Sequence, residues 1–491
     1  MEDREIYQLG NLVSESSHEL TTNLSELAKS PSTLSKAFET FQKVDSLALC
    51  SLRKNLSKVH ELSLDIEKTL SRGGRIILCG CGATGRLALL LEHLFKKYYQ
   101  AHITSFMCGG DYALVQSIEA FEDHPEYGLR QLHELRPKEI DLFIGITEGG
   151  ETPFVIGATE EAASLCSVSY FLYCNPDDQL MQIKRSRSVL ENESIKKVNL
   201  TCGPMALSGS TRLQATSVQL IFCALSLECA LGLHRDSLES RFESLVKEHE
   251  LLDYRHLVPF TLWESDIYLN NGAVDYFCDE RDYLNILTDT TERAPTFNLR
   301  PFERKQDSFN SLVYCKINRA YSRSEFFRAI LSRSERPLDW NELEGRYSRK
   351  ALFSFLLDNK KREKSLRVDF PYSENKIMIY FQDIEIDISF SQSSHWMRTL
   401  FLKMLMNAHS TILMGRLGRY EGNMMMWVKP SNGKLKDRAI RYAQFLLARD
   451  EKSYQDLSYD QLYELLEEEL KEMNDKESIV MRLLERARPS R

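Results

Sequence analysis

Three segments of the chain combine glycines with hydroxyl-bearing side chains, and each follows an apolar run and precedes a helical pattern. They span residues 80–86, 145–153 and 203–212. Glycine lets the backbone approach a ligand closely, and a helix N-terminus offers free amides and the positive end of a dipole. Three such segments in one domain length predict a single site for a phosphate-type anion. The residues expected to bind it are Gly82, Ala83, Thr84, Gly85, Thr147, Gly149, Thr152, Ser208, Ser210 and Thr211.

These segments need a scaffold that brings them together, and the pattern over the first half of the chain predicts one. Continuous apolar strands alternating with helices are typical of a parallel sheet covered on both faces. Ligands bind such sheets at the carboxyl ends of the strands, where all three segments fall. The expected strands are 75–79, 102–108, 140–146, 167–174 and 196–201, and the expected helices include 46–72, 87–99 and 113–122.

The second half repeats the alternation less cleanly. Its first expected strand is followed by residues 279–282, which include three acidic side chains, in place of a glycine loop. Carboxylates there would repel a phosphate, so no second anion site is expected. The strands predicted in this half are 274–278, 283–287, 311–317 and 351–357, and residues 395–417 are predicted to form a long helix.

The last part of the chain, residues 431–491, is helical in pattern and acidic. Residues 462–473 carry leucines at helical spacing beside many glutamates. This pattern indicates an amphipathic cap helix with a solvated face, and a partner-binding surface is the alternative.

Composition narrows the class of protein. The chain has 491 residues, 43% hydrophobic and 27% charged, which predicts a globular protein with more than one domain. Its net charge of −8 argues against a nucleic-acid partner. The 11 cysteines lack metal-type spacing, and the N-terminus is charged, so we expect reduced thiols in a cytoplasmic protein. Gln214, Gln219 and Glu228 interrupt the apolar stretch 213–233, which predicts a buried helix and no membrane partner.

Several segments resemble a known family. Residues 80–87 resemble the first phosphate loop of sugar isomerase (SIS) domains in N-acetylmuramic acid 6-phosphate etherases and in glucokinase regulatory protein. Residues 108–111 and 119–123 are similar to the Gly-Gly-Asp and Glu-Gly-x-Glu-Asp stretches of both. Residues 201–212 resemble their Gly-Pro-x-x-Leu-x-Gly-Ser-[Ser/Thr]-Arg segment. In the second half the matching segments are 289–297, 407–418, 422–423 and 431–435.

The resemblance implies an α/β fold of two SIS-type doubly wound parallel-sheet modules in tandem, with a small C-terminal helical cap. The etherases have one module and dimerise, so the chain resembles a covalent pseudo-dimer with one intact and one degenerate site. We expect an N-terminal helical arm at 1–45, a first module with intact phosphosugar loops at 46–248, a second module with a degenerate loop at 249–430, and the cap at 431–491.

The resemblance also implies a pair of catalytic glutamates. One matches Glu122. The other falls at Leu94 in the first module, where it is lost, and at Glu292 in the second, where it is kept. The two carboxylates therefore meet only if the site lies between the modules. The implied chemistry is an elimination that needs no metal or organic cofactor. A base removes the proton alpha to the sugar aldehyde, an acid helps lactate leave the next carbon, and water adds back.

Two further positions bear on the ligand. Lys434 matches a lysine that contacts the ligand in glucokinase regulatory protein. In the second loop Gly149 stands where the family has a serine, and Glu148 and Glu151 flank it. Carboxylates near a phosphate are unfavourable unless they point away or bond sugar hydroxyls.

Three functions remain open at this point. The first is an etherase-type lyase of amino-sugar metabolism. The second is a non-catalytic sensor that binds a hexose or amino-sugar phosphate and signals to a partner such as a sugar kinase. The third is a sugar phosphate isomerase or another amino-sugar enzyme, because one fold hosts several activities.

The same residues also have plain structural interpretations. Glu122 can be a surface residue, Glu292 can form a surface ion pair with Arg293, and Lys434 can be a helix-end lysine. The hydroxyls of the third segment can be helix N-caps. His409 is expected to be a hydrogen-bonded polar group on a buried helix.

Overall fold

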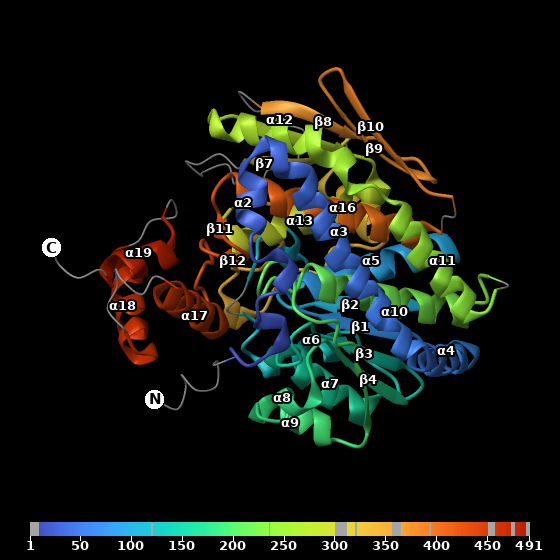
Figure 1. Cartoon of the computed structure of the whole chain (residues 1–491). Coiled ribbons are helices and arrows are strands. Elements are labelled where there is room, and N and C mark those ends of the chain that lie inside the picture. Colours follow the sequence, from blue (N-terminus) through green and yellow to red (C-terminus); the bar gives the residue numbers. More distant parts are fainter. Residues whose placement is uncertain are drawn as a thin grey trace.

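The computed structural model describes residues 9–118, 121–234, 236–299, 312–319, 322–355, 365–391, 394–449, 457–472 and 477–487. Over these ranges the chain forms two five-stranded sheets, and Figure 1 shows them on opposite sides of a central layer of helices. Three more helices lie beside this body at the C-terminal end. The α/β class with a small C-terminal helical region is confirmed.

The first sheet is fully parallel, with strand order β2-β1-β3-β4-β5. Its central strand β3 and the neighbouring β1 are buried along their whole lengths, as expected for a sheet covered on both faces. The strands are β1 (Ile76–Gly80), β2 (Ile103–Met107), β3 (Leu142–Ile146), β4 (Val168–Tyr173) and β5 (Ile195–Asn199). The helices of this part are α4 (Leu56–Ser71), α5 (Gly82–Tyr99), α6 (Pro125–Glu134), α7 (Pro153–Leu165), α8 (Asp177–Leu180), α9 (Lys184–Glu191), α10 (Gln214–Ala230) and α11 (Leu238–Leu251).

One predicted helix of this half is wrong. Where a helix was expected over 113–122, the described residues form a short 3₁₀ turn, η5 (Gly110–Leu114), followed by irregular backbone; residues 119–120 lie outside the described ranges. Asp111, in this turn, is held by donors from the second half of the chain. Tertiary contacts therefore decide the local conformation here.

Helix α10 is the buried helix predicted from the apolar stretch. Its two glutamines find partners inside the protein: Gln214 Nε2 donates to Asp45 Oδ1 at 2.6 Å, and Gln219 Nε2 donates to the Thr147 carbonyl at 2.8 Å. None of the described helices has the length and apolar character needed to cross a membrane.

The second sheet is mixed, with strand order β10-β9-β8-β6-β7. Strands β6, β7 and β8 are parallel, and β9 and β10 add an antiparallel edge that the sequence pattern did not reveal. The strands are β6 (Ala273–Cys278), β7 (Val313–Ile317), β8 (Ser365–Phe370), β9 (Lys376–Phe381) and β10 (Ile384–Ser389). The helices are α12 (Val258–Leu269), α13 (Glu280–Phe297), α14 (Arg323–Leu331), α15 (Arg349–Leu352) and α16 (His395–Arg416).

Two strands predicted in this half are wrong. Residues 283–287 belong to helix α13, because Asp279 caps that helix by accepting a hydrogen bond from the Arg281 amide. Residues 351–352 belong to the short helix α15, which Ser348 caps in the same way; residues 356–357 lie outside the described ranges. Both are short apolar runs, and such runs do not distinguish a buried helix from a buried strand.

The chain ends pack on the body and on each other. Helices α2 (Leu24–Lys29) and α3 (Leu34–Ser51) contact α16 of the second half, and α3 also contacts α10. A small hairpin, β11 (Tyr420–Glu421) and β12 (Met424–Met425), precedes the C-terminal helices α17 (Gly433–Arg449), α18 (Tyr459–Glu472) and α19 (Ile479–Arg486). On α18, Leu462 and Leu466 are buried, which gives that helix the predicted amphipathic character.

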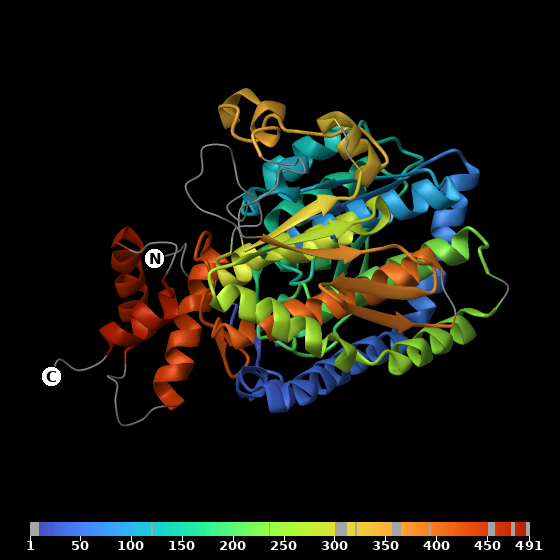
Figure 2. The ribbon, with the colours of Figure 1, turned by 90° about the horizontal axis from the view of Figure 1, so that it is seen from above.

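A buried ion pair joins the two halves near η5. Arg333 follows α14, which Figure 2 shows in gold beside the helices of the first half. Its Nη1 and Nη2 donate to the two carboxylate oxygens of Asp111 at 2.7 and 2.9 Å. Asp111 is 2% exposed, so its charge depends on this partner.

Removing the cation tests how far the halves depend on each other. In Arg333→Met the Asp111 carboxylate stays buried without its ion-pair partner, and we expect the free energy of unfolding to fall by about 3–5 kcal/mol. Urea unfolding measures this. The control is Arg53→Met, which removes a bidentate pair with Glu243 whose side chains are 55% and 54% exposed, and should cost below about 1 kcal/mol. Equal losses in both variants would contradict the expectation.

Candidate active site

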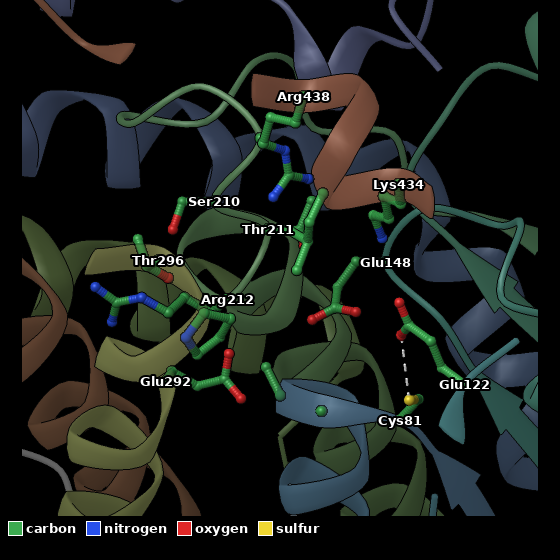
Figure 3. Close-up of a pocket in the computed structure, with 15 residues that line it drawn as sticks. Cys81, Glu122, Glu148, Ser210, Thr211, Arg212, Glu292, Thr296, Lys434 and Arg438 are labelled. Carbon is green, nitrogen blue, oxygen red and sulfur yellow. Dashed lines mark hydrogen bonds between the residues drawn. The ribbon is translucent and has the colours of Figure 1, made fainter. Parts of the chain in front are cut away.

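A pocket lies where the loops of the first sheet face helix α13 of the second half and helix α17 of the C-terminal region (Figure 3). Seven of the residues predicted from the sequence meet here: Gly82, Ala83, Glu122, Ser210, Thr211, Glu292 and Lys434. The remaining lining residues are Cys81, Glu148, Gly209, Arg212, Pro295, Thr296, Leu435 and Arg438.

The first loop presents backbone to the pocket. Thr84 helps to cap the N-terminus of α5. Its hydroxyl donates to the Cys81 carbonyl at 2.9 Å and accepts from the Cys81 amide at 3.1 Å. Its hydroxyl is therefore engaged in the cap. Gly82 and Ala83 occupy the first turn of the helix, where amides have no partner within the helix. Gly82 has a φ of +52°, which favours glycine, and a Cβ there would lie 3.8 Å from Glu292 Oε1.

Gly85 has a packing role. A Cβ at this position would lie 2.6 Å from the Met107 Cβ, so glycine allows helix α5 to approach strand β2 closely. Gly85 and Thr84 lie outside the pocket lining and support its first loop from behind.

The third loop presents a side chain. The amides of Ser208, Gly209 and Ser210 donate to the carbonyls of Asn423, Ser14 and Leu207, so they are occupied. The hydroxyls of Ser208 and Ser210 are buried and make no hydrogen bond within the described part of the chain. A buried hydroxyl without a partner costs about 1–3 kcal/mol, which a bound ligand can recover. Of these two hydroxyls, that of Ser210 belongs to a pocket-lining residue.

The second loop folds back on itself. The Thr147 hydroxyl lies 3.0 Å from that of Thr152 and accepts from the Gly150 amide, and the Gly149 carbonyl accepts from Asn175 Nδ2. Thr147, Gly149 and Thr152 thus lie outside the pocket lining. From this loop it is Glu148 that reaches the pocket.

The second acidic residue of this loop, Glu151, points away toward cations. Its carboxylate lies 3.0 Å from Lys434 Nζ and 2.9 Å from Arg185 Nη2. Burial alone would raise its pKa, but Lys434 and Arg185 hold the pKa at about 2. The pKa of Lys434 is in turn raised: burial would lower it, and Glu151 and Glu122 outweigh burial. Glu151 thus positions Lys434 at the pocket wall.

The other two cations of the pocket wall are also anchored from outside it. Arg438 forms a bidentate pair with Glu15 of the N-terminal turn η1 (Val13–Glu15), and Arg212 Nη1 donates to Asp289 Oδ1 at 3.0 Å. The three cations therefore come from α17 and the third loop, and each is oriented by a carboxylate outside the lining.

The two predicted glutamates lie on opposite parts of the lining. Glu122 accepts from Asn432 Nδ2 at 2.6 Å and from Cys81 Sγ at 3.3 Å. Glu292 projects from α13 and pairs with the buried Arg86 of α5. Figure 3 shows Glu148 between them. Because Glu292 comes from the second half of the chain and Arg86 from the first, the pocket is built by both.

Glu148 differs from the other two carboxyl groups. Burial, reinforced by the nearby Glu292, raises its pKa to about 7 although Lys434 opposes the shift. It is half-buried, and its Oε1 lies 3.0 Å from the Thr216 hydroxyl on α10. A carboxyl with such a pKa holds a proton over part of the physiological pH range.

Sequence reasoning missed several of these residues. Glu148 was identified as unfavourable to phosphate binding unless it points away or bonds sugar hydroxyls, and it was not predicted as a site residue. Arg212 ends the third predicted segment, so its position in the sequence indicated that it lies near the site. Arg438 follows Lys434 by one helical turn, which places both cations on the same face of a helix.

Two predicted structural roles can be compared with the fold. Arg293 is buried and pairs with Asp289, and Glu292 pairs with Arg86, so the alternative of a surface ion pair between Glu292 and Arg293 is wrong. His409 is a buried, hydrogen-bonded residue as predicted: its ring contacts the Thr261 hydroxyl and Glu264 Oε2 at 2.8 Å each. The expected free thiols are also found, at all 11 cysteines.

The chain is similar in sequence to known proteins. Residues 57–163 match the family model of the glucokinase regulatory protein N-terminal SIS domain. The chain is 32% identical to N-acetylmuramic acid 6-phosphate etherase of Cutibacterium acnes over 34% of its own length and 53% of the relative's. It is 30% identical to the enzyme of an Enterobacter species over 43% and 67%, and 28% identical to that of Lactococcus lactis over 46% and 72%.

The fold and the pocket define a two-sheet α/β protein with a pocket between its halves that is lined by cations and carboxyl groups. The chain belongs to the SIS-domain family of N-acetylmuramic acid 6-phosphate etherase and glucokinase regulatory protein. It spans about half of the first of these relatives. Among solved structures, tagatose-6-phosphate ketose/aldose isomerase of Escherichia coli covers 82% of this chain and 98% of its own at 9% identity and a TM-score of 0.44, too distant to support an argument.

The Glu151 anchor has a measurable pH dependence. A carboxyl group with a lowered pKa stabilises the fold above its unfolded pKa of about 4.3, and this contribution is lost as the pH falls through the folded value. We expect Glu151→Gln to lower the free energy of unfolding at neutral pH, and the difference from wild type to narrow as the pH falls below about 4.5. Urea unfolding between about pH 7 and pH 3 tests this. Glu193→Gln, at an exposed position, should show no such trend. A difference that stays constant with pH would contradict the assignment.

Proposed function

We propose that this pocket binds a hexose or amino-sugar phosphate. The observation that carries the proposal is the meeting, in one pocket, of a wall suited to an anion, built by the first half of the chain and helix α17, and a carboxylate from helix α13 of the second half. The wall offers the first turn of α5, the Ser210 hydroxyl and the cations Lys434 and Arg438. The phosphate fits this wall, since helix N-termini and cations both favour an anion. The sugar then lies among carboxylates that accept from its hydroxyl groups.

We further propose that the bound sugar phosphate is turned over by etherase-type elimination. The relatives named above are etherases of N-acetylmuramic acid 6-phosphate, and this chain has both glutamates at the pocket. A base takes the proton from the carbon alpha to the aldehyde of the open sugar. The electrons form a double bond to the next carbon as its bond to the lactate oxygen breaks. The leaving oxygen takes a proton from an acid, and water then adds across the double bond.

The contacts of the two glutamates favour one assignment of the base and the acid. Arg86 pairs with Glu292, and such a pair forms only with the ionised carboxylate, which is the form that a base requires. This leaves Glu122, in another part of the lining, as the proton donor to the leaving oxygen. Both of its oxygens accept hydrogen bonds here, from Asn432 and Cys81, so it must gain a proton before it can donate one. Each residue is expected to contribute about 10²–10⁴-fold in rate.

A second candidate is a sensor that binds the sugar phosphate without turnover. It is favoured by the match to the glucokinase regulatory protein SIS domain and by the way both chain ends close the pocket. Glu15 near the N-terminus pairs with Arg438, and Asn432 pairs with Glu122. A ligand that alters these contacts changes the packing of α17, and so a surface open to a partner such as a sugar kinase.

Lactate release separates the two candidates. Purified protein with N-acetylmuramic acid 6-phosphate should release lactate, and Glu122→Gln and Glu292→Gln should each lower kcat by about 10²–10⁴-fold. Glu122→Gln should still bind the substrate, because the wall proposed to hold the phosphate is unchanged. Glu292→Gln also leaves the buried Arg86 without its ion-pair partner, so the free energy of unfolding of this variant is measured beside its binding. A coupled lactate assay and isothermal titration calorimetry measure the two properties.

The controls make the result interpretable. Glu193 is exposed and is not part of the pocket lining, so Glu193→Gln should leave kcat unchanged. Tight binding of a hexose phosphate with no lactate from wild type would exclude the lyase and support the sensor. A screen of hexose and amino-sugar phosphates that finds no binding would overturn both candidates.

A further inference from the structure

Glu148 is a third carboxyl group in a pocket whose proposed chemistry uses only two. It stands in the loop expected to contact phosphate, and the other carboxylate of that loop, Glu151, is turned away and neutralised by Lys434 and Arg185. Glu148 faces the pocket instead. An ionised carboxylate in that position repels a phosphate, so its protonation state determines what the pocket accepts.

The hydrogen bonds around Thr216 indicate that state. Its hydroxyl oxygen lies 3.0 Å from Glu148 Oε1 and 3.0 Å from the Thr211 carbonyl oxygen. A hydroxyl has one proton to donate, and a carbonyl only accepts. Both contacts are hydrogen bonds when Thr216 donates to Thr211 and Glu148 carries a proton that it donates to Thr216. The Thr216 contacts therefore favour the neutral acid, whereas the hydrogen bond from the backbone amide of Glu148 to its own carboxyl group favours the ionised form.

The charged groups around Glu148 oppose one another, and burial decides the direction of its pKa shift. Lys434 of α17 favours the ionised form, and Glu292 of α13 opposes it. Lys403 of α16 also lies within electrostatic range, as does Cys174 at the end of β4, whose backbone amide donates to the Glu148 carbonyl at 2.9 Å. Burial dominates these opposing charges and raises the pKa to about 7.

We propose that Glu148 determines the specificity of this pocket by binding the ligand as a neutral acid, so that a sugar phosphate enters together with one proton. This inference rests on the proposed binding of a sugar phosphate, and it holds for the lyase and the sensor alike. An anion next to Glu148 favours its protonated form, and by linkage a proton on Glu148 favours the anion. The affinity for the phosphate then falls as the pH rises above the pKa of Glu148.

Isothermal titration calorimetry with fructose 6-phosphate, glucosamine 6-phosphate and N-acetylmuramic acid 6-phosphate tests this between about pH 6 and pH 8.5. We expect the wild-type affinity to fall by up to about tenfold per pH unit above pH 7. Glu148→Gln keeps a neutral side chain of the same shape and should bind about tenfold more tightly than wild type at pH 8. The phosphate itself titrates with a pKa of about 6, so the difference between the two proteins is the measured quantity.

Titrations in buffers of different ionisation enthalpy count the proton directly. Wild type should take up close to one more proton per ligand than Glu148→Gln at pH 8, and Glu193→Gln should match wild type. Lys403 and Asp45 also titrate near neutrality: burial lowers the pKa of Lys403 to about 7 and raises that of Asp45 to about 6. If the affinity of Glu148→Gln for the ligand depends on pH as that of wild type does, the titrating groups are Lys403 and Asp45, and the proposal is overturned.

Thr216→Val supplies a second test, because the two possible hydrogen-bond directions predict opposite shifts in the pKa of Glu148. Removing the hydroxyl that accepts from the neutral acid should lower the pKa of Glu148 and move the loss of affinity to lower pH. A move to higher pH would mean that Thr216 donates to an ionised Glu148, which contradicts the proposal. Binding by both proteins without any proton uptake would also overturn it and leave the proposed function intact. Absence of binding at every pH would overturn both.

Discussion

The ion pair between Arg86 and Glu292 is the interaction on which the site depends. A buried charge needs a partner, and these two partners come from different halves of the chain. Arg86 belongs to the first turns of α5, whose N-terminus is part of the wall that we propose binds the phosphate. Glu292 belongs to α13, which packs against α5. By pairing with Arg86, Glu292 is held beside Gly82 and directed into the pocket.

The same rule organises the rest of the pocket. Each cation of the lining is oriented by a carboxylate outside it: Lys434 by Glu151, Arg438 by Glu15, and Arg212 by Asp289. These carboxylates come from the second loop, the N-terminal turn and α13. The cations are thus held in place before any ligand arrives, which lowers the entropic cost of binding. Glu15 of the N-terminal turn η1 takes part in this arrangement, and of the C-terminal helices α17 contributes to the pocket lining.

Several polar side chains in the three loops have a structural task. Thr84 caps its own helix, and Thr147 and Thr152 bond to each other and to the backbone of their loop. Such closed loops hold their shape without a ligand. The groups left for a ligand are fewer than the pattern suggests. They include the first-turn backbone of α5, the Ser210 hydroxyl, the three cations and the three carboxyl groups.

The sequence by itself determined much of the first half. Glycine loops between apolar strands and helices predicted the parallel sheet and the edge where its loops gather, because strand burial and turn chemistry are local properties. It also predicted that Glu122 and Glu292 would face one pocket from different modules, through the family pattern. In the second half, short apolar runs such as residues 283–287 left helix and strand unresolved, and the antiparallel edge β9–β10 went unseen.

Only the tertiary structure decided which groups face the ligand and in what charge state. Whether Thr84 or Ser210 is free for a ligand depends on partners that no spacing reveals. The pKa of Glu148 depends on burial and on Glu292 and Lys434, which lie far from it in the chain. Electrostatic and hydrogen-bond energies depend on distances in space, and sequence separation does not determine those distances.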